Sequence, residues 1–194
     1  MQAASFVTAL KASQGLVKVN DHIKNYRPKI IVLSGDPPSR PNLVDFANLI
    51  TKKLSLMSTL DIVDDEDWKT VETRKQLGQA WLLSNKIKGF HSVTRNSCFR
   101  YSVPLVSQKQ SLMLVFSDGV RSALELHGLS KLSPNMLMLG FKEDWLMEGM
   151  LEHSVDYYQT LFTAMDMRLA VGILRLPEKY RSSEETETIA EEQW

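Results

Sequence analysis

The feature that most constrains the fold is a regular alternation of short apolar runs with longer amphipathic stretches. The clearest run, residues 29–34 (KIIVLS), is rich in β-branched side chains and is followed by Gly35. Such a run is typical of a strand that is buried on both faces. Further strands are predicted over 56–63, 88–93, 136–140 and 168–176, with helices between them. This order predicts an α/β fold, a mostly parallel, doubly wound sheet of about five strands with helices on both faces.

Helical periodicity identifies the side chains that we expect to cover this sheet. Pro41 is suited to the first turn of one helix. Asp118 is suited to cap the start of a second helix, which ends before Gly128, and Ser154 is suited to be the N-cap of a third. A further helix is predicted to end near Ser84. The apolar residues assigned to the helices are Leu43, Phe46, Ala47, Ile50 and Leu54; Trp68, Val71, Leu77, Ala80 and Trp81; Val120, Ala123 and Leu124; and Val155, Tyr158, Phe162 and Met165.

The pattern divides the chain into three parts. Residues 1–20 contain an amphipathic helix whose apolar stripe is Phe6, Leu10 and Val17. An isolated helix of this length is marginal in water, so we expect the stripe to be a partly exposed interface. Residues 21–177 form the α/β domain, in which 94–117 is predicted to be an irregular insertion. Residues 178–194 contain six acids and two bases, and we expect this acidic tail to be disordered.

Charge and composition exclude several function classes. Lys and Arg together number 23, as do Asp and Glu, so the basic excess of a dedicated nucleic-acid binder is missing. One cysteine among 194 residues excludes an intrachain disulfide and a multi-cysteine zinc site. There is no apolar run of the roughly 20 residues that a membrane span needs. No G-x-S-x-G elbow occurs, and the four histidines lack metal-ligand spacing. We therefore expect neither an enzyme nor a metal or cofactor site.

A parallel sheet of this kind usually binds ligands at the carboxyl ends of its strands. Gly35 follows the first strand, but the nine glycines include neither a G-x-G-x-x-G motif nor a Walker loop. The favoured interpretation of Gly35 is a tight strand-to-helix turn, and the alternative is a nucleotide site near Gly35 and Ser39. In the tail, Ser182, Ser183 and Thr188 precede acidic residues. An acid-directed kinase could modify them, and an unmodified linker is the competing interpretation.

Four segments carry a family resemblance. They are HIKNYRPKIIVLSGDPPSRPNLVDF (22–46), KIKGFHS (86–92), GLSKLSPNMLMLGFKEDWL (128–146) and DYYQTLFTAMDMRLAVGILRLPE (156–178). In order and spacing they resemble the cation–chloride cotransporters, above all the sodium-dependent branch. Two local features differ from that family: 94–117 is longer than its short connection, and Ser58-Thr59-Leu60 replaces a strand end that usually contains Cys-Gly.

The resemblance implies a function that the residues alone do not. It implies the first α/β half of a cytosolic C-terminal regulatory domain, similar in fold to the universal stress proteins and not known for catalysis. Its partners would be the membrane transport domain of the same parent, a second copy in a homodimer, and a regulatory kinase. The parent would move chloride with sodium, potassium or both, and this domain would lie at the cytosolic face of the membrane. The alternative is a free-standing nucleotide-binding protein of the universal-stress type.

Overall fold

The computed structural model describes residues 2–20, 22–52, 54–64, 67–96, 119–125, 127, 130–142 and 151–177. The strands are β1 (Ile30–Leu33), β2 (Met57–Asp64), β3 (Phe90–Asn96), β4 (Met136–Gly140) and β5 (Ala170–Leu174). The helices are α1 (Gln2–Gly15), α2 (Pro41–Thr51), α3 (Trp68–Ser84) and α5 (Leu151–Asp166), and residues 119–125 are also helical. Short 3-10 turns are η1 (Leu16–Lys18), η2 (Ile23–Asn25), η3 (Pro37–Ser39) and η4 (Ser130–Leu132).

The five strands form one sheet in the order β3-β2-β1-β4-β5, and every neighbouring pair is parallel. In the centre of the sheet, Ile30 of β1 is in register with Met57 of β2 and with Met136 of β4. The predicted α/β class, strand number and strand direction are therefore confirmed.

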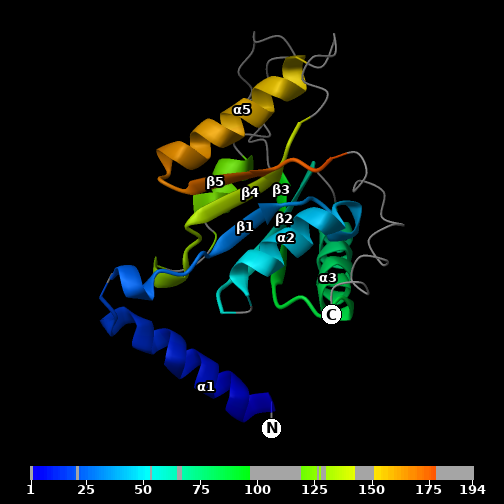
Figure 1. Ribbon diagram of the computed structural model, residues 1–194. Helices are drawn as coiled ribbons and strands as arrows, with labels where there is room; N and C mark the ends of the chain where they lie inside the picture. Colours follow the sequence, from blue (N-terminus) through cyan, green and yellow to red (C-terminus); the bar gives the residue numbers. More distant parts are fainter. Residues whose placement is uncertain are drawn as a thin grey trace, which may run out of the picture.

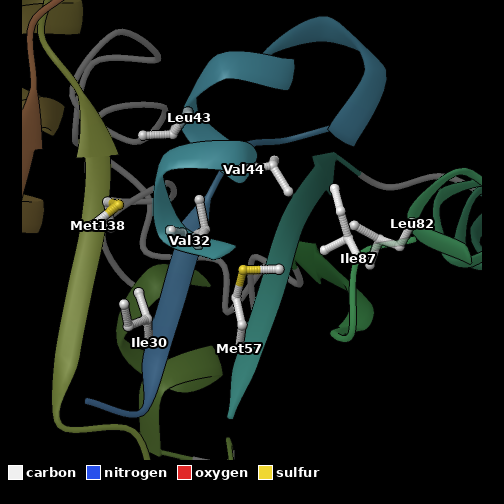
Figure 2. Packing of buried hydrophobic residues seen from close by; sticks show 9 residues of the cluster. Ile30, Val32, Leu43, Val44, Met57, Leu82, Ile87 and Met138 are labelled. Atoms are coloured by element: carbon white, nitrogen blue, oxygen red, sulfur yellow. The ribbon is translucent and has the colours of Figure 1, made fainter. Parts of the chain in front are cut away.

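A hydrophobic cluster lies on each face of the sheet. One joins alternate strand residues such as Ile30, Val32 and Met138 to Val44 of α2 and Leu82 of α3, and Figure 2 shows these side chains converging between helix and sheet. The other joins the opposite face to helical residues 119–125 and to α5. Its main members are Ile31, Leu60, Val120, Ala123, Leu124, Leu137, Leu139 and Ala164. Because both faces are covered, β1 and β4 are apolar throughout, as their sequence indicated.

Several helix faces differ from the prediction. In α5, three of the residues expected to cover the sheet are instead exposed: Tyr158, Phe162 and Met165. Thr160 and Ala164 are buried in their place. Also exposed are Phe46 in α2, Leu54 just after it, and Trp68 and Leu77 in α3. In α3 and α5 the small residues Gly78, Thr160 and Ala164 are buried together with Leu82. The predictions for α2 and for residues 119–125 are confirmed at Leu43, Ala47, Val120, Ala123 and Leu124, which are all buried. The predicted Ser154 N-cap is also wrong, since α5 begins at Leu151.

Some boundaries are corrected and others lie outside the described residues. Strand β3 extends to Asn96, so the irregular segment begins after 96 rather than at Thr94. The remainder of that segment, the proposed cap at Asp118 and the acidic tail lie outside the described residues. Helix α1 ends at Gly15 and projects away from the sheet, on the side where the strands begin (Figure 1). Among the described residues, no helix combines the length and the apolarity needed to cross a bilayer.

Candidate functional site: a pocket at the carboxyl ends of the strands

The strand order creates a crevice beside β1. From β1 the chain moves outward to β2 and β3, and then returns across β1 to β4 and β5. At this topological switch the connections diverge, which leaves space at the carboxyl ends of β1 and β4. A cavity of about 750 Å³ lies there and contacts Gly35, Ser39, Gly140, Lys142 and Tyr157, among others. Its volume is within the range of small-molecule sites.

The turn after β1 forms one wall of this cavity. Gly35 has a φ of +64°, a conformation that glycine adopts without strain, and its N–H donates to the carbonyl of Leu60 at 3.2 Å. Ser34 is buried, and its hydroxyl donates to the carbonyl of Gly35 at 2.9 Å. The backbone N–H and the hydroxyl of Ser39 both donate to the carbonyl of Asp36, at 3.0 and 2.6 Å. These bonds give a rigid turn, as the sequence predicted for Gly35.

A buried carboxylate lies beside this turn. Asp61 is 5% exposed, and Nε of Arg74 donates to its Oδ2 at 3.3 Å. A side-chain atom added at Gly35 would lie 3.7 Å from Oδ1 of Asp61, so the turn and the carboxylate are neighbours. The Asp61–Arg74 pair neutralises this wall, while Arg40 and Lys142 bring positive charge to the cavity.

Helix α5 contributes a tyrosine to the cavity. The hydroxyl of Tyr157 is buried and forms no well-aligned hydrogen bond with the described residues. Burial and the neighbouring Tyr158 raise the pKa of Tyr157, and the nearby backbone N–H of Lys142 opposes part of that rise. The rings of Tyr157 and Tyr158 meet edge to face with centroids 6.0 Å apart. A neutral phenol in this position is suited to hydrogen bonding rather than to proton transfer at neutral pH.

A second cavity, of about 510 Å³, lies beside the amino-terminal halves of β2 and β3 and contacts His91 and His127. Nδ1 of His91 is 2.9 Å from the hydroxyl of Thr59, and Nε2 of His127 is 2.8 Å from the hydroxyl of Ser58. Burial lowers the pKa of both histidines; for His91, Asp36 opposes this effect and Arg74 adds to it. His91 is 4% exposed, more buried than its sequence context suggested.

The structure separates the residues predicted as sites into different regions. Gly35 and Ser39 both line the larger cavity. Phe6, Leu10 and Val17 are 66%, 49% and 81% exposed on and just after α1. Ser182, Ser183 and Thr188 lie outside the described residues. No group of three His, Cys, Asp or Glu side chains in the described ranges could hold a metal ion.

Asp61, Tyr157 and Thr160 were not predicted as cavity residues. The only local signal was the polar alternation of Thr59 and Asp61 within an apolar strand. Tyr157 and Thr160 reach the cavity from a helix about 100 residues further along the chain, so no local pattern indicates their position.

Comparison with known proteins identifies the family. Residues 40–193 match the profile of solute carrier family 12. The chain is 34% identical over 182 residues to solute carrier family 12 member 1 of Mus musculus, covering 92% of this chain and 15% of that protein. It is also 34% identical over 176 residues to the bumetanide-sensitive sodium-(potassium)-chloride cotransporter of Manduca sexta, covering 90% of this chain and 15% of that protein. The chain thus spans about a seventh of these relatives.

A solved protein of the universal stress protein family from Burkholderia pseudomallei is similar at 14% identity with a TM-score of 0.39, covering 76% of this chain and 96% of that one. The α/β assignment rests on the sheet order above and not on this likeness. The matches to solute carrier family 12 cover most of the chain and confirm the resemblance to cation–chloride cotransporters seen in its sequence. The chain therefore belongs to solute carrier family 12.

Proposed function

We propose that this chain is a regulatory and dimerisation module of a cation–chloride cotransporter, at the cytosolic face of the membrane. Two observations support it: family membership across residues 40–193, and the exposed apolar stripe of α1. Its partners are a second copy and the transport domain of the same parent. The parent moves chloride together with sodium, potassium or both. The module acts by contacting one transport-domain conformation more favourably than another. A kinase acting on Ser182, Ser183 or Thr188 would alter those contacts.

The observation that carries this proposal is that Phe6, Leu10 and Val17 remain exposed in one copy of the chain. Burying such side chains stabilises an interface by about 1.5–3 kcal/mol each at most. We therefore expect concentration-dependent self-association. Amide exchange across residues 3–18 should slow as protein concentration rises, whereas exchange in β1 should stay slow throughout.

A matched pair of variants tests the role of the stripe. Phe6→Ser combined with Leu10→Ser should abolish the concentration dependence. Leu49→Ser combined with Leu77→Ser removes two comparably exposed leucines from α2 and α3 and should leave it unchanged. Amides of α1 that are as protected as those of β1 at every concentration would contradict the proposal, because α1 would then be stable without a partner.

A second candidate function is the binding of a nucleotide in the larger cavity, which Gly35 and Ser39 line together with the cations Arg40 and Lys142. The single glycine turn argues against it, since phosphate loops need clustered glycines for close backbone approach. Calorimetry with adenine nucleotides separates the two candidates. Micromolar binding that Arg40→Ala weakens would favour the nucleotide function, and absence of heat at millimolar nucleotide would reject it.

A further inference from the structure

Positive charge gathers at the edge of the sheet where the strands begin. In a parallel sheet all strands start at the same edge, so the segments that lead into them are neighbours. Segments 26–29, 52–56, 85–89, 130–135 and 167–169 contain no Asp or Glu. Their described bases form what we call the amino-edge cluster: Arg27, Lys29, Lys52, Lys86, Lys88, Lys131 and Arg168. Among the described residues, the neighbouring acids are Asp166, in the last turn of α5, and Glu125, at the end of the helical residues 119–125.

Most of this cluster faces solvent. Lys52, Lys86, Lys88 and Arg168 are exposed, and Lys29 and Lys131 are half-buried. The amino group of Lys29 donates to the carbonyl of Lys131 at 2.7 Å, which holds these two segments together. Arg74 of α3 pairs with Asp61 of β2, and the pairs Lys75–Glu72 and Arg121–Glu125 lie within single helices. None of these three ion pairs involves the cluster.

Three of these cations occupy backbone conformations that usually favour glycine. Lys52, Lys86 and Arg168 have φ values of +48°, +57° and +59°, each directly after or close to the end of a helix. The amides of Lys86 and Ile87 donate to the carbonyls of Leu83 and Leu82, the pattern of a helix end whose left-handed residue is normally glycine. Arg168 and Leu169 repeat it after α5. The chain thus keeps a charge at positions where glycine would relieve strain.

Helix α1 leaves the molecule on the side of this cluster (Figure 1). Residues 1–20 contain Lys11 and Lys18 but no Asp or Glu, and Phe6, Val7 and Leu10 are exposed there. Each exposed Lys or Arg close to the surface of an anionic bilayer is attracted to it by about 1 kcal/mol. The balanced net charge of the chain argues against a nucleic acid as the alternative polyanion.

We propose that the amino-edge cluster binds anionic phospholipid headgroups and thereby orients the sheet with its amino edge toward the bilayer. The proposal rests on the proposed function insofar as a cotransporter module lies beside a membrane. The lipid proposal and the proposed function can be rejected independently, because self-association through α1 is measured in the absence of lipid.

The full chain should bind vesicles made of equal parts phosphatidylcholine and phosphatidylserine, and not vesicles of phosphatidylcholine alone. Added salt should weaken this binding, since screening acts on exposed charges. Each cluster lysine lost should lower the partition coefficient about fivefold. Lys52→Gln, Lys86→Gln and Lys88→Gln combined should therefore lower it by about a hundredfold. The matched control, Arg40→Gln, Lys69→Gln and Arg95→Gln, removes the same charge from exposed positions at the opposite, carboxyl edge of the sheet and should lower it less than about fivefold.

Two further variants exclude misfolding as the cause. Lys86→Gly and Arg168→Gly remove charge and relieve the positive φ, so their melting temperatures should be equal to or above that of the parent chain while lipid binding falls. Equal losses in the test and control variants would overturn the proposal. Equally strong binding to vesicles of phosphatidylcholine alone would also overturn it. So would a loss of vesicle binding that occurs only when Phe6→Ser is combined with Leu10→Ser, or tighter binding to duplex RNA than to the anionic vesicles.

Discussion

Two neighbouring hydroxyl residues of β2 each hold one histidine, on opposite faces of the sheet. Ser58 contacts His127 and Thr59 contacts His91. Nε2 of His91 is buried and has no hydrogen-bond partner among the described residues. Because a protonated imidazole donates from both nitrogens, charging His91 would leave a buried cationic donor without an acceptor. The neutral form of each histidine is therefore the one compatible with the folded state.

This arrangement predicts that stability falls in mild acid. The folded-state pKa of His91 and of His127 is below the ordinary value of 6.5, so near pH 6 the unfolded chain binds more protons than the folded chain. The contribution of the two neutral histidines to the free energy of unfolding is fully present above pH 6.5. It is lost as the pH falls through 6.5 toward the pKa values of the histidines in the folded chain. Urea-unfolding midpoints measured from neutral pH downward should decrease accordingly.

Substitution identifies the histidines responsible. In His91→Gln and in His127→Gln the decrease below pH 6.5 should be smaller than in the parent chain. His22 is exposed, and His22→Gln should retain the full decrease. A parent chain whose midpoint is constant between neutral pH and pH 5.5 would contradict this account, as would identical pH profiles in all three variants.

At the scale of elements, the sequence predicts the strands better than it predicts the helix faces. The runs at β1 and β4 are unambiguous because both faces are buried. In α3 and α5, hydrophobicity pointed to Leu77 and Phe162, but the buried positions are Gly78 and Leu82 in α3 and Thr160 and Ala164 in α5. Small residues allow close approach, and a rule based on side-chain hydrophobicity ranks them last. The buried face of a helix is decided by the strand residues that lie opposite each of its turns. Those strand residues come from distant parts of the chain.

Gly78 illustrates this dependence and gives a prediction. A side-chain atom at Gly78 would overlap Cδ2 of His91, so the imidazole occupies the space next to the helix. Gly78→Ala should therefore destabilise the protein by about 1–3 kcal/mol through overpacking, although alanine is preferred to glycine within helices by about 1 kcal/mol. Unfolding in urea measures the change.

The matched control is Gly15→Ala at the end of α1, where no atom lies within 4 Å of the added position. It should leave the free energy of unfolding unchanged or slightly increased. Combining Gly78→Ala with His91→Ala should recover part of the stability lost in Gly78→Ala alone. A Gly78→Ala chain as stable as the parent would show that α3 can move away from β3 without cost.

On the scale of the whole molecule, the cavity at the switch point depends on long-range assembly. The turn at Gly35 is evident from the sequence, since a glycine directly follows a buried strand. Asp61 comes from β2 and Tyr157 from α5, and only the strand order brings them to the same cavity as Gly35. Sequence patterns therefore predict the position of the site at the carboxyl edge, but not the side chains that give it its chemistry.

The same sheet joins the two hydrophobic clusters, so we expect one unfolding transition. Leu137 and Met138 are adjacent in β4 and almost fully buried on opposite faces. Leu137→Ala and Met138→Ala should each cost about 2–5 kcal/mol. Trp81 packs against the cluster that contains Met138 and is separated by the sheet from Leu137. The chain has four tryptophans, so the other three are replaced by phenylalanine to leave Trp81 as the only fluorophore. In Leu137→Ala on this background, the urea midpoint followed by tryptophan fluorescence should nevertheless shift as far as the midpoint followed by circular dichroism. Two separate midpoints in that variant would mean that α2 and α3 remain folded on the sheet after α5 has dissociated.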